Sequence, residues 1–163
     1  MPEKSLDEHK VLANWKEAAF RKLAVQGLHP TPGLFGLMAW ADSLGITMAA
    51  VTNAPQANAD LILNSLNLKH RFKTIVIGDE LPRGKPDPMP YLVAGKRLGV
   101  ALSQCVAFED SRSGMRSASA SGAVSIGIMS NLPESELVKV GAQFAVSTFG
   151  DERLRPLILK TLE

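Results

Sequence analysis

Apolar and polar residues follow one another along the chain in two periods, one typical of helices and one typical of buried strands. Over residues 6–26, apolar positions recur every three or four residues and charged residues fill the other face, which predicts an amphipathic helix. A second helical pattern covers residues 34–45, after a Thr31-Pro32 pair that is typical of a helix start. We therefore expect two helices before the first strand.

Short apolar runs then alternate with further helical patterns up to the carboxyl end. Gly, Pro or Asp stands at most of the boundaries, as is usual where strands and helices begin or end. Alternation at this spacing implies an α/β, Rossmann-like fold, with a doubly wound parallel sheet and right-handed crossovers. The expected strands are 46–51, 74–77, 104–108, 123–128 and 143–146, and the helices that follow them begin near Pro55, Asp87, Arg112, Glu134 and Asp151.

Composition narrows the class of protein. The 163 residues, 45% of them hydrophobic, suffice for one globular domain with an apolar core. Its 18 Lys and Arg residues nearly balance 16 Asp and Glu residues without any basic run, so we expect no nucleic acid partner. No apolar run approaches the roughly 20 residues of a membrane span, and the polar start differs from a signal peptide, so a cytoplasmic protein without membrane contact is expected. The single cysteine, Cys105, excludes an internal disulfide and is predicted to lie in the core.

Three polar elements follow apolar runs along the chain. They are the pair Thr52-Asn53, the lysine of the loop Gly84-Lys85-Pro86-Asp87-Pro88, and the acidic pair Glu109-Asp110. Open α/β sheets bind their ligands at the carboxyl ends of the strands, so these elements are expected to lie together. Each one alone has a simpler interpretation, as a helix cap, a solvated lysine or a solvated acidic pair. Together they supply oxyanion donors, a cation and carboxylates for a divalent ion, which are the groups that phosphoryl transfer needs.

The order and spacing of the three elements resemble the second, third and fourth motifs of the haloacid dehalogenase-like hydrolases, in the subgroup of phosphoglycolate phosphatase and β-phosphoglucomutase. The resemblance extends from about residue 32 to the carboxyl end. It implies that Thr52 and Asn53 bind the transferring phosphoryl group and that Lys85 ties this group to the nucleophile. By the same resemblance, Glu109 and Asp110 hold Mg²⁺.

The chain departs from the family pattern at its front. Members of the family begin with a strand that ends in Asp-x-Asp-Gly, which supplies the nucleophile and the general acid-base, and a helical cap domain follows. No Asp-x-Asp occurs in this chain. Helix 6–26 resembles the last cap helix, so we expect one domain over residues 1–163, made of a residual cap-like helix in 1–28 and an α/β core in 29–163.

The absent family strand is central in the sheet, which has a consequence for its neighbours. Strands 46–51 and 104–108 are expected to face a gap, with unpaired backbone groups and an apolar slot, unless they close up and pair directly. The gap suggests a homo-oligomer in which an element of a neighbouring copy, such as the amphipathic helix, covers the slot.

The sequence leaves more than one function open. The first hypothesis is Mg²⁺-dependent hydrolysis of small phosphomonoesters without the usual Asp nucleophile, with another carboxylate or a water in its place. Asp60, Asp79 and Asp87 are available, but Asp87 has a ready helix-capping role. The second hypothesis is a noncatalytic protein that binds phosphate or a phosphorylated metabolite, and the third is a truncated product of a longer phosphatase gene. A reduced cap implies an open, promiscuous site, so the substrate is not predicted.

Overall fold

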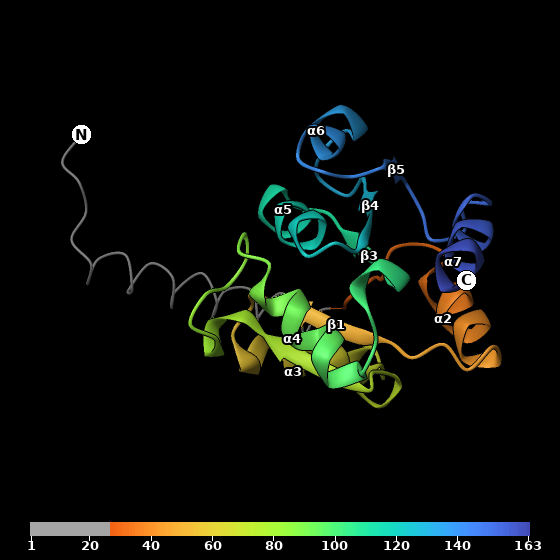
Figure 1. Cartoon of the computed structure of the whole chain (residues 1–163). Helices are drawn as coiled ribbons and strands as arrows, with labels where there is room; N and C mark the ends of the chain where they lie inside the picture. Colours follow the sequence, from red (N-terminus) through yellow and green to blue (C-terminus); the bar gives the residue numbers. More distant parts are fainter. Residues whose placement is uncertain (1–26) are drawn as a thin grey trace.

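Five short strands form two separate parallel sheets in the computed structural model, which describes residues 27–163 (Figure 1). The predicted α/β fold with parallel strands is confirmed. The predicted helix over residues 6–26, and with it the residual cap of the expected domain division, lies outside the described residues.

The first sheet has two strands and the second has three. In the first sheet, β1 (Ala49–Thr52) pairs with β2 (Thr74–Ile77), with Val51 opposite Val76. The second sheet has the order β3-β4-β5, formed by β3 (Val106–Glu109), β4 (Val124–Ile128) and β5 (Phe144–Val146).

The two strands that were predicted to face a gap do not pair with each other. β1 pairs only with β2, and β3 pairs only with β4, so residues 27–163 supply no strand between them. An apolar cavity of about 640 Å³ lies between the two sheets and has wall residues from both strands. The expected gap is therefore confirmed for the described part of the chain, and direct closure of the two strands is not what the structure adopts.

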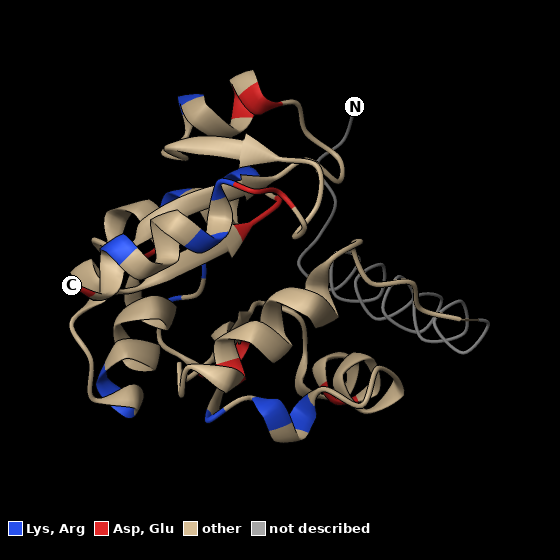
Figure 2. Cartoon of the chain, turned by 90° about the vertical axis from the view of Figure 1, so that its right-hand side faces the viewer, with Lys and Arg blue, Asp and Glu red and all other residues tan. Residues whose placement is uncertain are grey.

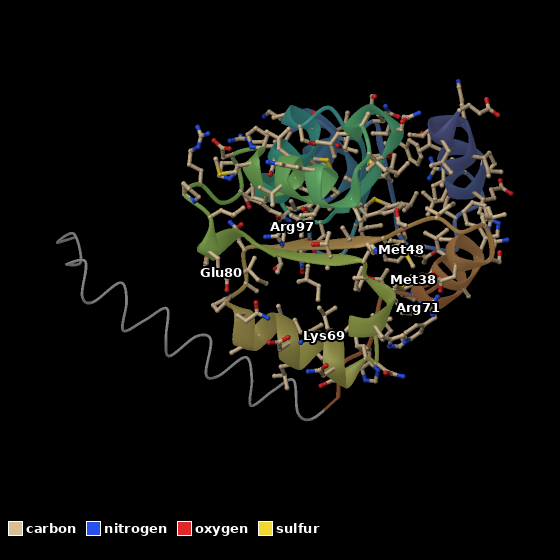
Figure 3. The ribbon with its side chains drawn as sticks, turned by 60° about the horizontal axis from the view of Figure 1, so that its bottom comes forward. Met38, Met48, Lys69, Arg71, Glu80 and Arg97 are labelled. Carbon is tan, nitrogen blue, oxygen red and sulfur yellow. The ribbon has the colours of Figure 1, made fainter. Side chains whose placement is uncertain are left out.

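Helices cover both sheets. α4 packs against β1 and β2, and α3 lies on the opposite side of this sheet (Figure 3). α5 packs against β3 and β4, and α6 packs against β5, while α2 and α7 lie side by side next to the second sheet (Figure 1). The helices span Leu34–Ser43 (α2), Gln56–Ser65 (α3), Met89–Leu98 (α4), Arg112–Ala120 (α5), Glu134–Lys139 (α6) and Leu154–Leu162 (α7).

Three apolar clusters hold these layers together. The largest joins β4 and β5 to α2 and α7 through Ile126, Val146 and Leu154, all fully buried. A second cluster surrounds Tyr91 of α4 and Ala107 of β3. A third lies between α5, α6 and β5. The second cluster matters most for the site, because it fixes α4 against the end of β3.

The start of α2 differs from the prediction. The helix begins at Leu34, with Gly33 rather than Thr31 in the cap position and with a positive φ of 84°. A Cβ on Gly33 would lie 2.3 Å from the amide nitrogen of Gly150, so the close backbone contact requires glycine. Thr31 contributes its carbonyl oxygen instead, which accepts a hydrogen bond from the Leu34 amide at 3.2 Å.

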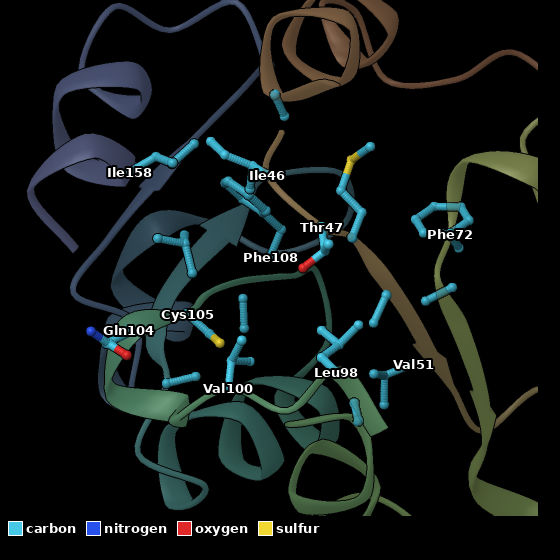
Figure 4. A pocket seen from close by; sticks show the side chains of 18 of the residues that line it. Ile46, Thr47, Val51, Phe72, Leu98, Val100, Gln104, Cys105, Phe108 and Ile158 are labelled. Atoms are coloured by element: carbon cyan, nitrogen blue, oxygen red, sulfur yellow. The ribbon is translucent and has the colours of Figure 1, made fainter. Parts of the chain in front are cut away.

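Cys105 is not a core residue, contrary to the prediction. It is only partly buried and stands in the wall of the cavity between the sheets (Figure 4), where Sγ donates to the Ala101 carbonyl oxygen at 3.4 Å. The apolar run in which it occurs borders a gap rather than a filled core. Burial still raises the pKa of the Cys105 thiol, which disfavours the reactive thiolate.

Charges of both signs are spread over the elements of the described chain (Figure 2). In the whole sequence they sum to a formal charge of +2. None of the helices in residues 27–163 has the length and apolar character needed to cross a membrane.

Candidate active site

The three predicted polar elements meet at the carboxyl ends of β1 and β3. Lys85 lies in the loop between a short 3-10 turn, Gly78–Glu80, and α4. Its Nζ donates to the carbonyl oxygen of Val51 in β1 at 2.8 Å and forms an ion pair with Oε1 of Glu109, the last residue of β3. Both side chains of this pair are only 8% exposed. One ammonium group thus connects the two sheets across the end of the gap.

Asn53 fixes the backbone of Lys85. Its Nδ2 donates to the Lys85 carbonyl oxygen and its Oδ1 accepts from the Lys85 amide, both at 3.0 Å. Gly78 permits this arrangement, because a Cβ there would lie 2.1 Å from Asn53 Oδ1. The side chain predicted to bind a phosphoryl group therefore also positions the lysine, and one Nδ2 hydrogen is left over.

Thr52 ends β1 and begins the turn toward α3. Its Oγ1 accepts a hydrogen bond from the Ala54 amide at 2.9 Å. The hydroxyl hydrogen is not used by this bond and can be donated to a ligand oxygen.

Tyr91 is a site residue that sequence reasoning did not single out. Its hydroxyl donates to Glu109 Oε1, the same oxygen that pairs with Lys85. Burial, and then the charge of Glu109, raise the pKa of Tyr91 well above its ordinary value, so the hydroxyl remains a donor. A signal was present in the sequence, since a tyrosine on the inner face of a helix needs a partner for its hydroxyl.

The amino end of α5 closes around Glu109 from another side. Ser111 caps the helix, with Oγ accepting from the Gly114 amide at 3.0 Å. A Cβ on Gly114 would lie 1.9 Å from Glu109 Oε2, so only glycine allows the helix to approach the carboxylate this closely. The positive end of the helix dipole favours negative charge at this position.

Asp110 follows Glu109 directly but has a different environment. It is exposed, and its Oδ2 accepts a hydrogen bond from Ser130 Oγ, beyond β4, at 2.9 Å. Burial and a cation therefore fix one carboxylate of the predicted metal pair, while the other is open to solvent.

The side chains of the site can offer Mg²⁺ two carboxylate ligands, those of Glu109 and Asp110. Mg²⁺ prefers oxygen ligands and is commonly held by one or two carboxylates, with water or substrate oxygens completing its shell. Glu109 and Asp110 supply such oxygens, although Glu109 Oε1 is already engaged by Lys85 and Tyr91. Within residues 27–163, no group of three or more His, Cys, Asp or Glu side chains is placed to hold a metal.

Two of the other aspartates considered for nucleophilic attack are engaged elsewhere. Asp87 Oδ1 accepts from the Met89 amide at 2.9 Å at the start of α4, although Pro88 rather than Asp87 occupies the cap position, and Oδ2 lies 3.3 Å from Arg83. Asp60 pairs with Lys69 at 2.6 Å on the α3 side of the molecule. Neither contact points to a replacement nucleophile.

Comparison with known proteins identifies the class to which this fold and site belong. The family model of the haloacid dehalogenase-like hydrolases matches residues 2–128, and the chain belongs to this family. The predicted family resemblance is thereby confirmed.

Individual relatives agree with this assignment. Fructose-1-phosphate phosphatase YqaB of Escherichia coli is 34% identical over 117 residues, covering 72% of this chain and 61% of that protein. Phosphoglycolate phosphatase of Pseudomonas savastanoi pv. phaseolicola is 33% identical over 97 residues, covering 60% of this chain and 36% of its own length. The structure of a HAD hydrolase, family IA, variant 3, from Entamoeba histolytica superposes with a TM-score of 0.87 at 30% identity, covering 99% of this chain and 74% of that one. The chain thus spans less than two thirds of these two phosphatases.

Proposed function

We propose that the chain hydrolyses small phosphomonoesters with Mg²⁺ as cofactor. The observation that carries this proposal is the position of Lys85, whose buried ammonium joins the carboxyl ends of β1 and β3 and lies beside Asn53 and Glu109. A fixed cation at this edge of a parallel sheet is suited to a phosphoryl group, because it neutralises charge on the nonbridging oxygens.

Each side chain of the site has a role in this proposal. Thr52 and the remaining Nδ2 hydrogen of Asn53 donate to phosphoryl oxygens, and the third N–H of the Lys85 ammonium does the same. Asn53 also holds the lysine in place through its two backbone hydrogen bonds. Because these donors are fixed before a ligand arrives, little reorganisation is needed when charge develops.

Glu109 and Asp110 are the residues that would hold Mg²⁺. The bound ion would supply Lewis acidity and lower the pKa of a coordinated water. Lys85 and Tyr91 restrain Glu109 through Oε1 and so orient its second oxygen. Asp110 lies on the solvent side, where a phosphomonoester can approach.

The proposed reaction is the transfer of a phosphoryl group to water. A bond forms between the water oxygen and phosphorus, the ester P–O bond breaks, and the departing alcohol receives the proton. We assign the nucleophile to no side chain. Asp60 and Asp87 already have structural partners, and the exposed Asp79 has no hydrogen bond or ion pair with Lys85, Asn53 or Glu109.

The named activities of the relatives support the choice of the first substrates to test. One is named as a fructose-1-phosphate phosphatase and another as a phosphoglycolate phosphatase, so small phosphorylated sugars and acids are the first compounds to test.

A noncatalytic phosphate-binding protein is the second candidate. The ion pair between Lys85 and Glu109 favours this candidate. The two buried charges neutralise each other, so the pair is stable without a substrate and has a structural role that does not require catalysis. This candidate predicts that phosphate or a phosphorylated metabolite binds in calorimetry without release of inorganic phosphate.

Phosphate release decides between the two candidates. We would measure release from fructose 1-phosphate, phosphoglycolate and related esters, with and without Mg²⁺. The Asp110→Asn variant is expected to lose Mg²⁺-dependent turnover by about a hundredfold or more, because a neutral amide is a poor ligand for Mg²⁺. Glu152→Gln is the matched control, since it removes an exposed carboxylate outside the site and should leave turnover unchanged.

Each result has a definite meaning. Release that requires Mg²⁺ and disappears in a Glu109/Asp110 double-alanine variant supports the hydrolase. Turnover that survives Asp110→Asn contradicts the proposed metal ligands, and binding without release at any Mg²⁺ concentration favours the noncatalytic candidate.

A further inference from the structure

The loop that carries Lys85 has a second anchor, which comes from α5. Ser117 of this helix is fully buried, and its hydroxyl donates to the carbonyl oxygen of Asp87 at 2.6 Å. Ser117 follows Gly114 by three residues, so the two lie on the same face of the helix. The backbone of Gly114 approaches Glu109. One face of α5 thus holds both partners of the buried ion pair, the carboxylate directly and the lysine through its loop.

The Asp87 carbonyl group needs a donor from outside its own helix. In the first turn of α4, the residue three positions further on is Pro90, which has no N–H. The amide four positions further on, that of Tyr91, donates to the Pro88 carbonyl oxygen at 3.0 Å. The Ser117 hydroxyl supplies the donor that this helix start lacks, and a buried carbonyl group without a donor is costly.

A short, stiff segment connects Asp87 to Lys85. Pro86 stands between them and Pro88 follows, and each proline ring fixes its own φ near about −65°. The Asp87 amide also closes a turn by donating to the Gly84 carbonyl oxygen at 3.0 Å. A displacement of Asp87 is therefore passed on to Lys85 rather than absorbed between the two residues.

The two anchors of the loop belong to different sheets. Asn53, which follows β1, binds the backbone of Lys85 with two hydrogen bonds. Ser117 belongs to α5, which packs against β3 and β4. The Lys85 ammonium pairs with Glu109 at the end of β3, so the anchor from α5 fixes the loop to the sheet that carries the carboxylate.

We propose that Ser117 is a positioning residue for the reaction and acts on Lys85 through the Asp87 carbonyl group. The inference rests on the proposed hydrolysis of phosphomonoesters, in which the Lys85 ammonium neutralises charge on the phosphoryl oxygens. Ser117 contacts neither the substrate nor the metal in this role. Its hydroxyl keeps the loop, and with it the ammonium, at the place where the phosphoryl group binds.

Amide exchange in the loop tests this role without any substrate. The Lys85 amide donates to Asn53 Oδ1 and the Asp87 amide donates to the Gly84 carbonyl oxygen, so both amides report on order in the loop. In Ser117→Ala, we expect both to exchange about tenfold faster, beyond any change common to the strands. A serine that contributes only to global stability would change the exchange of loop and strands by one common factor.

Ser125→Ala is the matched control. Ser125 is also a buried serine, and its Oγ donates to a backbone carbonyl oxygen, that of Ala123, at 3.1 Å. Its removal deletes the same kind of hydrogen bond away from the lysine loop, so the loop amides should follow the strands. If Ser117→Ala fails to fold, Ser117→Cys replaces it. The thiol is a weak donor, so the same change in exchange is expected with a smaller size.

Kinetics measure the effect on the reaction. For fructose 1-phosphate, Ser117→Ala is expected to lower kcat by about tenfold and to change KM by about twofold or less. The reason is that the lysine acts mainly on charge that develops in the transition state. Ser125→Ala should change kcat and KM by about twofold or less.

Two results would overturn the proposal. The first is loop exchange in Ser117→Ala that changes only as much as the strands do, and the second is faster loop exchange with an unchanged kcat. If the wild-type chain releases phosphate from no ester, the proposed function fails and the exchange experiment decides alone. Faster exchange at Lys85 and Asp87 then still supports the positioning role of Ser117, and unchanged exchange refutes it.

Discussion

Glu109 is held from three sides, by the loop that carries Lys85, by α4 and by the amino end of α5. Lys85 and Tyr91 contact one carboxylate oxygen, and the backbone of Gly114 approaches the other. A buried carboxylate is costly unless it is paired and hydrogen-bonded, and these contacts meet that requirement. The Glu109 side chain therefore constrains which residues can stand at positions 85, 91 and 114.

Gly114→Ala tests the close approach of α5. The added Cβ would collide with a carboxylate that Lys85 and Tyr91 restrain, so we expect a loss of about 1–3 kcal/mol in the free energy of unfolding. Gly36→Ala is the matched control, because Gly36 is likewise the third residue of its helix and has no atom within 4 Å of a new Cβ. This variant should gain about 0.5–1 kcal/mol. Urea unfolding measures both, and similar changes in the two variants would contradict the proposed contact.

The ionisation of Tyr91 gives a test at high pH. Its folded-state pKa is raised, so folding favours the protonated hydroxyl, and stability is retained below the unfolded value near 10 and lost as the pH rises above it. Tyr91 is the only tyrosine of the chain, so tyrosinate absorbance reports on it alone. We expect this absorbance to appear together with unfolding, and Tyr91→Phe to lose less stability between pH 10 and about 12. Ionisation near pH 10 in the folded protein would refute the buried contact.

At the scale of elements, α5 connects the site to the packing of the second sheet. Its amino end lies at Glu109, and its buried face contacts β3 and β4. The helix is nine residues long, which is too short to be stable without tertiary contacts. Its cap is therefore expected to matter for stability and for the site together.

Ser111→Ala removes that cap. We expect a cost of about 1 kcal/mol in the free energy of unfolding, because the Gly114 amide loses its acceptor. Ser111→Asp should restore most of the loss, since aspartate is an equally good cap. Ser43→Ala removes a serine hydroxyl at the carboxyl end of α2 and serves as the control, with a change within about 0.5 kcal/mol. A Ser111 variant that behaves like the control would show that the cap contributes nothing.

The existence of the described elements could be predicted from sequence, but several of their ends could not. Apolar periodicity indicated a strand at 46–51, whereas β1 begins three residues later and ends at Thr52. The run that was expected to start a strand at 104 begins with a 3-10 turn, Leu102–Gln104. Tertiary contacts set these boundaries, as the contact of Gly33 with Gly150 shows for α2. A local pattern contains no information about such distant partners.

At the scale of the whole molecule, one buried ion pair joins the two sheets. Lys85 precedes α4, which packs on the first sheet, and Glu109 belongs to the second. Removal of one partner leaves an uncompensated charge in a buried place. The pair therefore contributes to the relative position of the sheets as well as to the site.

A double-mutant cycle measures this contribution. Lys85→Met is expected to cost about 3–5 kcal/mol, and Lys85→Met with Glu109→Gln should cost clearly less than the sum of the two single changes. The exposed pair Arg112–Glu136, 2.9 Å apart, is the matched control, and its cycle should give about 0–1 kcal/mol. Urea unfolding of all the variants gives the coupling energies. A Lys85–Glu109 coupling no larger than the control would contradict the structural role.

The meeting of the three polar elements was predictable, because carboxyl ends of parallel strands lie at one edge of the sheet. Their hydrogen bonds were not, since Asn53 binds the Lys85 backbone and Tyr91 shares an oxygen with Lys85. The roles of Thr52, Asn53, Lys85, Glu109 and Asp110 toward phosphate and Mg²⁺ stay predictions. Contacts between side chains depend on helix placement and on the separation of the sheets, which no spacing in the sequence encodes.

The site is divided between two sheets that do not pair with each other, so its geometry depends on the separation of the sheets. Thr52 and Asn53 follow one wall of the cavity, and Glu109 and Asp110 follow the other. A ligand that sets the distance between β1 and β3 also sets the distance across the phosphate site. Occupancy of the slot and occupancy of the site are then thermodynamically linked, and by reciprocity each ligand changes the affinity for the other by the same factor.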